Sequence, residues 1–309
     1  MVGPADKMPK RYKVLITGSS GMLGADLSVE LRRDYEVTGA DLLNSPWSAV
    51  SGFHRGDIAD KAAIAKIISE IKPDAVVHAA AWTDVDGCEL NRDKAHSVNA
   101  EGARNVALAC KASGALMVYI STDFVFDGRK EKPYSERDAA SPISVYGHSK
   151  LEGEEAVKKS LKRYFILRTS WLYGRRGKNF VNTIISKART EKALRVVDDQ
   201  AGSPTYTKDL ASAIHKLLDK ALGAGSLSER AYGTYHVSNS GKVSWYDYAR
   251  EILAISGSKA KVVPMSSAEL ERPAKRPAMS VMDNTKFRRI TGYRMRPWKT
   301  ALKEYLLKG

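Results

Sequence analysis

Apolar and polar positions alternate with two periods along the chain from residue 11 onward. Short runs rich in β-branched residues, "YKVLITG", "YEVTGAD", "DAVVHAA" and "ALMVYIST", predict buried strands. Longer runs with helical spacing separate them, namely "MLGADLSVELRRD", "DKAAIAKIISEIK" and "AHSVNAEGARNVALACKASG". Strands that alternate with helices in this way are typical of an α/β fold, so we expect a doubly wound parallel sheet covered by helices.

The regular alternation weakens after one more predicted strand, "RYFILRTSWLYG". A loop at "DDQAGSPTYTKD", a helix through "LASAIHKLLDKAL", a break at "GAGSLSERAYG" and a closing helix after Pro297 follow it. We expect a larger lobe over residues 11–170, to which later segments such as 198–222 return, and a smaller lobe built mostly from 171–309. Residues 1–10 form an N-terminal extension that no motif explains.

Composition limits the class of protein. The chain has 309 residues, of which 43% are hydrophobic, and it shows neither an apolar signal core nor a stretch long enough to cross a bilayer. We therefore expect a cytoplasmic protein with no membrane contact. Cys88 and Cys110 are expected to be reduced, packed thiols.

The chain is strongly basic, with 50 Lys and Arg against 35 Asp and Glu and a net charge of +15. Such a charge fits nucleic acid, an anionic small molecule or solubility alone. The basic residues are spread out, without interleaved aromatics or zinc-finger spacing, so we expect no nucleic-acid partner. The densest basic region, "ERPAKRPAMSVMDNTKFRR", either neutralises a diphosphate or lies in solvent.

A glycine-rich turn joins the first strand to the first helix. Gly18, Gly21 and Gly24 lie in "VLITGSSGMLGADL", where backbone amides and the helix N-terminus favour a pyrophosphate. Their G-x-x-G-x-x-G spacing departs by one residue from the dinucleotide fingerprint. Asp41 ends the second strand, where a carboxylate binds a ribose diol and repels a 2′-phosphate; the alternative is a capping role.

Small and polar residues follow the next strands. Asp57 ends "RGD", and Ala80 and Ala81 leave room for a flat cofactor at the carboxyl end of "DAVVHAA". The strand "ALMVYIST" ends at Thr122 and is followed by Asp123, where a hydroxyl can donate to a substrate carbonyl. A structural role for Thr122, capping a turn, is the alternative.

A tyrosine and a lysine lie four positions apart in "SVYGHSKLEGEEAVKKSLK", which has the pattern of a helix. Lys150 then shares a face with Tyr146, and an ammonium near the phenol is expected to lower its pKa from about 10 toward neutral pH. A random pair of this spacing is common, so its weight comes from the strand-end hydroxyl and the phosphate loop. Together these groups predict hydride transfer.

The sequence resembles the extended short-chain dehydrogenases/reductases, and within them the dTDP-4-dehydrorhamnose reductases. The resemblance runs through "GSSGMLG", "HAAAWTDVDGCE", "ISTDFVFDG", "SVYGHSKLEGE", "LRTSWLYG", "DQAGSPTYTKDLA", "WYDYA" and "RPAMSVMDNTKF". It implies a Rossmann domain that binds NADH or NADPH over residues 11–170. It also implies a smaller C-terminal lobe that binds the sugar nucleotide, and reduction of a 4-keto-6-deoxy sugar carried on a nucleotide diphosphate.

By the same resemblance Tyr146 is the proton donor, Lys150 tunes it and holds the nicotinamide ribose, and Thr122 binds the keto oxygen. Asn99 supports the lysine, and packing is its alternative role. Asp123 and Trp171 contact the sugar. The implied cofactor contacts are Gly18, Gly21, Met22, Leu23, Gly24, Asp41, Asp57, Ile58, Ala80, Ala81, Trp82, Tyr146 and Lys150.

Two features limit what the resemblance implies. Residues 1–10 match no motif of the family, and Trp82 stands where a smaller side chain or a histidine is also usual. The exact sugar therefore stays open. A reductase or epimerase acting on another nucleotide sugar is one alternative, because all would share the cofactor lobe. A non-catalytic regulator resembling the methionine adenosyltransferase beta subunit is another, since it can keep the tyrosine and lysine.

Three further expectations complete the prediction. The six histidines show no ligand spacing on one helix, so we expect no metal site within a protomer. The protein is expected to be a monomer or a weak homodimer. Asp41 predicts a modest preference for NADH over NADPH, although Arg55 in the next strand region could reach a 2′-phosphate.

Overall fold

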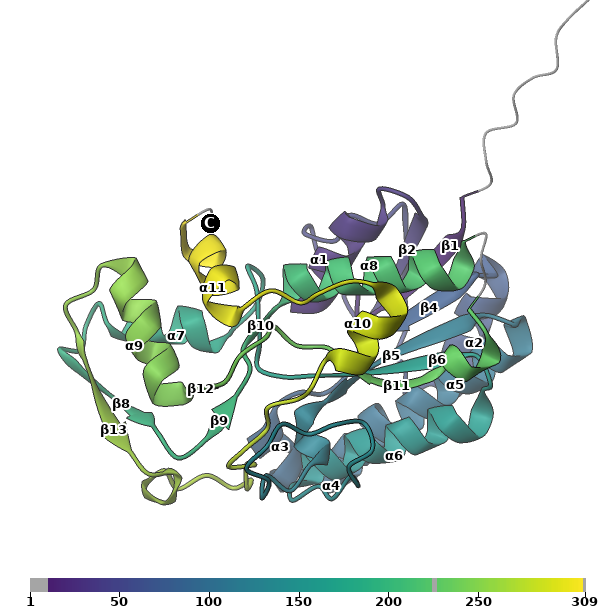
Figure 1. Cartoon of the computed structure of the whole chain (residues 1–309). Helices are drawn as coiled ribbons and strands as arrows, with labels where there is room; N and C mark the ends of the chain where they lie inside the picture. The colour runs from purple at the N-terminus through teal and green to yellow at the C-terminus, as the bar shows by residue number, and fades with distance from the viewer. Residues whose placement is uncertain (1–10, 224–226, 308–309) are drawn as a thin grey trace, which may run out of the picture.

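A seven-stranded parallel sheet forms the centre of the larger lobe in the computed structural model, which describes residues 11–223 and 227–307 (Figure 1). The predicted extension over residues 1–10 lies outside the described residues. The strand order β11-β6-β5-β4-β1-β2-β3 reverses between β1 and β4, which confirms the doubly wound fold. The strands are β1 Lys13–Thr17, β2 Glu36–Asp41, β3 Gly52–Arg55, β4 Ala75–His78, β5 Leu116–Thr122, β6 Tyr164–Thr169 and β11 Gly233–His236.

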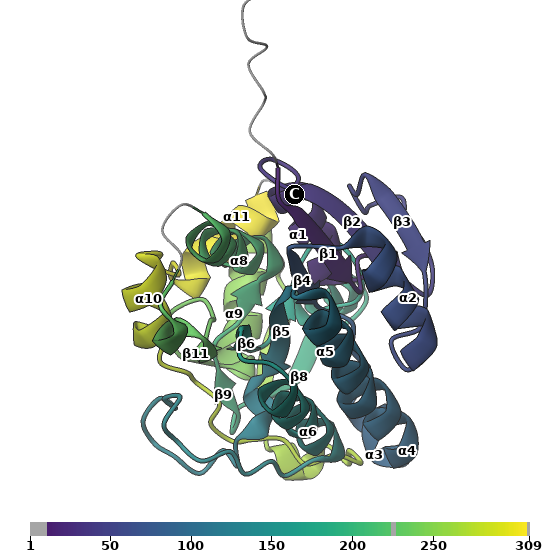
Figure 2. The ribbon, with the colours of Figure 1, turned by 90° about the vertical axis from the view of Figure 1, so that its right-hand side faces the viewer.

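Helices cover both faces of this sheet (Figure 2). One face is covered by α1 Met22–Leu31, α8 Thr207–Leu222 and α10 Thr285–Thr291. The other is covered by α2 Lys61–Ile71, α5 Gly102–Ser113 and α6 Val145–Ser160. Because α8 and β11 come from late in the chain, the polypeptide returns to the larger lobe after it has entered the smaller one. The strand within "ERAYGTYH", β11, was not predicted, because its four residues, GTYH, lack the apolar β-branched run that marks β4.

The smaller lobe has an apolar core of its own, rich in aromatic side chains. Its parallel strand pair β8 and β13 lies at the far end from the main sheet (Figure 1). Three aromatic residues, Tyr173, Tyr248 and Trp298, are buried where its helices meet. Its elements are β7 Leu172–Tyr173, α7 Phe180–Lys187, β8 Ala193–Val197, β9 Ala201–Gly202, β10 Thr205–Tyr206, β12 Val243–Ser244, α9 Trp245–Ser256, β13 Lys261–Met265 and α11 Trp298–Leu307.

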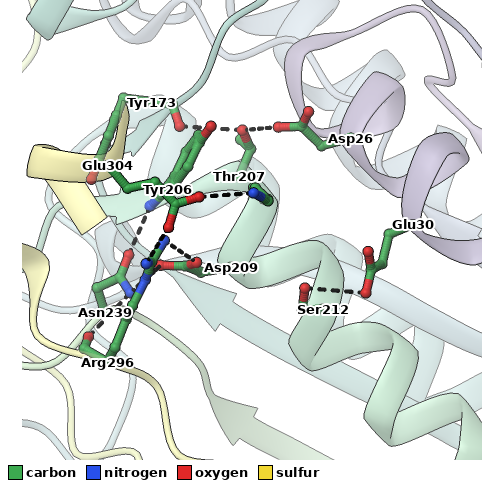
Figure 3. A network of polar contacts seen from close by, with 11 residues as sticks. Asp26, Glu30, Tyr173, Tyr206, Thr207, Asp209, Ser212, Asn239, Arg296 and Glu304 are labelled. Atoms are coloured by element: carbon green, nitrogen blue, oxygen red, sulfur yellow. Dashed lines mark hydrogen bonds and ion pairs between the residues drawn. The ribbon is translucent and has the colours of Figure 1, made fainter. Parts of the chain in front are cut away.

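A polar network joins the two lobes (Figure 3). Arg296 donates through Nε to Asp209 Oδ2 on α8 at 2.8 Å and through Nη1 to Glu304 Oε2 on α11 at 2.5 Å. Asn239 Nδ2 donates to the same Asp209 oxygen at 2.8 Å. The last helix of the smaller lobe is thereby tied to a helix of the larger one, beside the chain segments that cross between them.

The predicted single helix over residues 95–114 is wrong in detail. The chain forms α3 Val85–Leu90 and α4 Arg92–Ala95, then a π-helix, His96–Glu101, and only then α5. The wide π turn turns the Asn99 side chain inward, where it binds the backbone of Trp82. π turns of this kind occur often at functional sites. The predicted end at Gly114 is correct, because Gly114 takes the left-handed conformation with φ of 76°.

Candidate active site

The glycine-rich turn lies at the carboxyl edge of the sheet with its backbone packed closely. Gly18 has φ of 75°, and a Cβ atom there would lie 2.6 Å from the backbone nitrogen of Ala80. A Cβ on Gly24 would overlap the carbonyl oxygen of Gly18. Gly21 is the N-cap of α1. Only glycine fits at these two contacts, and the open backbone before a helix N-terminus can cradle a diphosphate.

Met22 and Leu23, two of the implied cofactor contacts next to the phosphate loop, differ in whether their side chains are accessible to a ligand. Met22 begins α1 and lies beside the loop after β7, since a Cβ on Gly174 would lie 3.0 Å from Met22 Cγ. Leu23 is buried in the core between the sheet and α8. A ligand in the loop can therefore meet the side chain of Met22, but only the backbone of Leu23.

Asp41 ends β2 directly beside this turn. Its Oδ2 accepts from the backbone nitrogen of Ser20 at 2.9 Å, and its Oδ1 accepts from that of Leu42 at 2.7 Å. Each carboxylate oxygen has a second lone pair, so ribose hydroxyls can still donate to it. The strand register places Arg55 of β3 next to Asp41. The Asp41 carboxylate is thus held in place at the loop, whereas the Arg55 side chain, which would favour a 2′-phosphate, is exposed at the end of the neighbouring strand.

The residues after β3 and β4 border the same edge. Asp57 is exposed, whereas Ile58 is buried against α2 and α5, so only the backbone of Ile58 faces the edge. Ala80 and Ala81 are half-buried in the extended segment that leads to Trp82. Asn99 fixes this segment, because Asn99 Oδ1 accepts from Trp82 N at 2.8 Å while its Nδ2 donates to Trp82 O at 3.0 Å. Its Nδ2 also lies 3.0 Å from Ser149 Oγ on α6.

Tyr146, Thr122 and Asp123 lie together where β5 ends and α6 begins. Ser144 caps α6 by accepting from Gly147 N at 3.2 Å, which places Tyr146 in the first turn. A Cβ on Gly147 would overlap the carbonyl oxygen of Phe124, so the helix start packs directly on the segment after β5. A hydrogen bond joins the hydroxyls of Tyr146 and Thr122, and Thr122 Oγ1 donates to Asp123 Oδ1 at 3.0 Å.

The carboxyl group of Asp123 is buried and unusually basic. Burial raises its pKa from 3.8 to about 6, although hydrogen bonds from the side chains of Ser280 and Thr122 oppose this. Within the described residues its Oδ2 is enclosed by protein and forms no regular hydrogen bond, so the interaction with Ser280 is a weak one.

Lys150 is buried one turn after Tyr146 on α6. Its Nζ donates to the carbonyl oxygen of Ile120 at 2.8 Å and lies 4.2 Å from the centre of the Tyr119 ring. Burial lowers its pKa from 10.5 to about 7, and the charge of Glu154 partly opposes this. Glu154 is itself paired with Arg168 through two hydrogen bonds of 2.8 and 2.7 Å.

The expectation that Lys150 lowers the pKa of Tyr146 is wrong. Burial raises the pKa of Tyr146, and only its hydrogen bond with Thr122 lowers it. The physical reason is that the Lys150 ammonium is directed to the Ile120 carbonyl and is itself disfavoured by burial. The phenol is therefore protonated at neutral pH, which is the form that a proton donor requires.

A cavity of about 700 Å³ lies beside this site and is lined mostly by residues of the smaller lobe. Phe124 and Ser280 line it next to Asp123, and Trp171 lines it after β6. Trp171 has φ of 49°, a strained value for a non-glycine residue, and stacks on Trp245 with ring centroids 3.4 Å apart. Trp171 therefore borders the cavity and also packs within the smaller lobe.

Basic side chains line the same cavity, and sequence reasoning assigned them no role individually. They are Lys187, Arg195, Arg272, Lys275 and Arg276. Arg276 is held by Asp86 of α3 through contacts of 3.1 and 2.7 Å, and burial lowers the pKa of Arg272. Arg272 and Arg276 belong to the basic region "ERPAKRPAMSVMDNTKFRR", so part of that region faces the cavity rather than solvent. Such a lining suits a diphosphate.

No metal centre is evident in the described parts of the chain, where groups of three or more His, Cys, Asp or Glu with suitable placement are lacking. Cys88 and Cys110 are both free and buried. Over residues 11–223 and 227–307, the helices are also too short or too polar to cross a membrane.

Comparisons with known proteins agree with this architecture. The family model described as RmlD substrate binding domain matches residues 12–308. The spore coat polysaccharide biosynthesis protein SpsK of Bacillus subtilis is 41% identical over 297 residues, with 95% of this chain and 96% of the relative covered. A dTDP-4-dehydrorhamnose reductase of Streptomyces griseus is 40% identical over 299 residues, with 95% of this chain and 93% of the relative covered.

A solved structure is similar over almost the whole chain. The crystal structure of dTDP-4-dehydrorhamnose reductase from Bacillus anthracis in complex with NADP has a TM-score of 0.87 and 39% identity, with 97% of this chain and all of that chain covered. The resemblance drawn from the motifs is thus confirmed. This chain belongs to the dTDP-4-dehydrorhamnose reductase family, within the extended short-chain dehydrogenases/reductases.

Proposed function

We propose that this protein reduces the C4 keto group of dTDP-4-dehydro-6-deoxy-L-mannose (dTDP-4-dehydrorhamnose) to give dTDP-L-rhamnose, with NADH or NADPH as the reductant. The observation that carries the proposal is that two parts of the site, a polar cluster and a basic cavity, lie next to each other. The cluster of Tyr146, Thr122 and Asp123 at the sheet edge lies beside the arginine-lined cavity of the smaller lobe, because Phe124, which follows Asp123 in the chain, and Ser280, which interacts with Asp123, line that cavity. A keto sugar at the cluster would have its nucleotide diphosphate among basic side chains.

The phosphate loop fits a dinucleotide cofactor. The contacts of Gly18 and Gly24 leave the backbone before α1 open, and Asp41 is held beside it with free lone pairs for a ribose diol. Bound NADH or NADPH supplies the hydride that reduces C4. The half-buried Ala80 and Ala81 border the position between the loop and Lys150, where a nicotinamide ribose would lie.

The residues of the cluster would each act on the sugar. Thr122 would hydrogen-bond the keto oxygen, and Tyr146 would donate its proton to that oxygen as the carbonyl is reduced. Because burial raises the pKa of Tyr146, the phenol holds this proton at neutral pH. Lys150 would hold the nicotinamide ribose, while Asp123 and Trp171 would contact the sugar, Trp171 from the wall of the cavity.

A substrate panel tests the proposal. Oxidation of NADH and NADPH is followed with dTDP-4-dehydrorhamnose beside its UDP and GDP counterparts, and the product is identified by NMR. We expect turnover with the dTDP sugar to give dTDP-L-rhamnose. Turnover with a different nucleotide or sugar would favour another reductase or epimerase, and no oxidation with any ketosugar would favour a non-catalytic regulator.

Two coarser expectations accompany the activity. We place the protein in the cytoplasm, where nucleotide sugars are made and where its two free cysteines would stay reduced. We also expect a monomer or a weak homodimer. Size-exclusion chromatography with light scattering at several protein concentrations measures the mass directly, and a stable larger assembly would contradict this.

A further inference from the structure

We propose that Tyr119 is a positioning residue for Lys150: its ring face holds the ammonium group, and its hydroxyl ties the helix that carries Lys150 to the sheet. The inference rests on the proposed function only in taking Lys150 as a working group of the site. The geometry concerns the free protein and can be tested without substrate.

Tyr119 is the last member of a buried row that crosses three strands. The register pairs Thr17 of β1 with His78 of β4, and His78 with Tyr119 of β5. Side chains paired in this way leave the same face of a parallel sheet. Thr17 Oγ1 and His78 Nδ1 are 2.6 Å apart, and His78 stacks on Tyr119 with ring centroids 5.5 Å apart and planes 21° apart. Since Gly18 follows Thr17, the row begins at the phosphate loop and ends beneath Lys150.

Tyr119 contacts Lys150 in two ways. The Lys150 Nζ lies 4.2 Å from the centre of the Tyr119 ring, which is within the range of a cation–π interaction. The Tyr119 hydroxyl lies 3.4 Å from the carbonyl oxygen of Lys150 and 3.5 Å from that of Asn99, and it can donate to either. A Cβ on Gly153 would overlap this hydroxyl. Glycine at position 153 therefore allows α6 to approach the ring closely.

The charges around Lys150 leave a role for the ring. Glu154, one turn further along α6, makes two hydrogen bonds to Arg168 of β6, so much of its charge is already balanced. Burial lowers the pKa of His78 on β4 to about 3, and burial raises that of Tyr146 on α6, so both are neutral near pH 7. The ring face and the Ile120 carbonyl then supply the negative potential that meets the ammonium directly.

The π-helix also packs on α6, as do α3, α4 and α5. Its titratable residues, His96 and Glu101, lie 3.6 Å apart at the surface, and His96 also lies 2.8 Å from Glu152. These exposed groups are screened by solvent, and the two buried residues of this element, Asn99 and Ala100, are neutral. The same neutral surroundings make the ammonium sensitive to the electron density of the Tyr119 ring.

The test is an NMR titration of the protein with 13C at the ε-carbon of lysine. The Lys150 signal is assigned by its loss in Lys150→Met. Tyr119→Phe removes the hydroxyl and keeps the ring, and phenylalanines with increasing numbers of fluorine atoms at position 119 then weaken the ring face at nearly constant shape. We expect the pKa of Lys150, about 7 in the wild type, to fall stepwise with fluorination, by about 0.5 to 1 pH unit in total.

The outcomes separate the inference from the proposed function. A pKa that is unchanged by fluorination overturns the role of the ring, even where Lys150→Met abolishes turnover. A stepwise fall together with full activity of Lys150→Met supports the positioning role and contradicts the proposed use of Lys150. If Tyr119 positions Lys150 and Lys150 is needed for turnover, the alkaline limb of the pH profile of kcat should move to lower pH as fluorine atoms are added, in step with the pKa of Lys150. Tyr232, a half-buried tyrosine, provides the matched position for a Tyr→Phe and fluorination control that should leave the Lys150 signal unmoved.

Discussion

Replacing Asp123 with asparagine should stabilise the protein at neutral pH and not in acid. Asp123 is buried at the end of β5, and burial raises its pKa from 3.8 to about 6. An acid with a raised folded pKa contributes to folding fully below its unfolded pKa, and this contribution is lost as the pH rises through the folded value. The amide introduced by Asp123→Asn does not titrate, so the variant does not lose stability through this group as the pH rises.

The magnitude follows from the difference between the two pKa values. The change from 3.8 to about 6 is about 2 pH units, and at 1.36 kcal/mol for each unit it corresponds to about 3 kcal/mol. This is an upper value, because the asparagine amide must also find hydrogen-bond partners near Thr122 and Ser280. The free energy of unfolding of Asp123→Asn relative to wild type should therefore rise by up to about 3 kcal/mol between about pH 4 and about pH 7.

Urea unfolding over this pH range measures the effect. Asp127→Asn, four residues later, is the matched control, because hydrogen bonding from the Tyr134 hydroxyl lowers the pKa of Asp127. Its stability relative to wild type should stay nearly constant between about pH 4 and about pH 7, because a pKa lowered from 3.8 affects stability only below this range. If the difference in free energy of unfolding between Asp123→Asn and wild type is constant with pH, or falls as the pH rises, the pKa of Asp123 is not raised by burial.

Three further substitutions test the two ends of the site. Asp41→Ala should narrow or reverse a modest preference for NADH in kcat/KM, and an unchanged ratio would show that this carboxylate does not read the ribose. Trp171→Ala should raise KM for the dTDP ketosugar with nearly unchanged NADH affinity, whereas equal losses or unfolding would mark its stack on Trp245 as core packing. Arg272→Gln should raise KM for the sugar nucleotide by about 10-fold, because Arg272 lines the cavity. The control is Arg250→Gln on α9, an exposed residue paired with Asp247, which should leave this KM unchanged. Similar KM values for the two variants would show that Arg272 does not bind the diphosphate.

Most of the fold of the cofactor lobe could be predicted from local features of the sequence. The turn after β1 and the acid that ends β2 are each readable from a few consecutive residues, and parallel strands bring such ends to one edge. The helical spacing of Tyr146 and Lys150 was likewise local. Because register and helix periodicity act over short distances, these placements follow from the pattern alone.

The features that were missed depend on contacts between distant segments. Arg272 lines a cavity that Arg195 and Phe124, which lie far from it in the chain, also line. The raised pKa of Tyr146 and the lowered pKa of Lys150 both come chiefly from burial, which a four-residue spacing does not reveal. The π turn at Asn99 has a sequence that reads as an ordinary helix.

Hydride transfer by Tyr146→Phe tests the central claim most directly. NADH oxidation with dTDP-4-dehydrorhamnose is measured for wild type, Tyr146→Phe and Tyr164→Phe, and NADH affinity is measured by fluorescence. Tyr164 starts β6, at the end of the strand opposite the site, and serves as the control. We predict that Tyr146→Phe lowers kcat by about 100-fold or more, that NADH affinity stays near normal, and that Tyr164→Phe behaves as wild type. Wild-type turnover by Tyr146→Phe would contradict its role as proton donor.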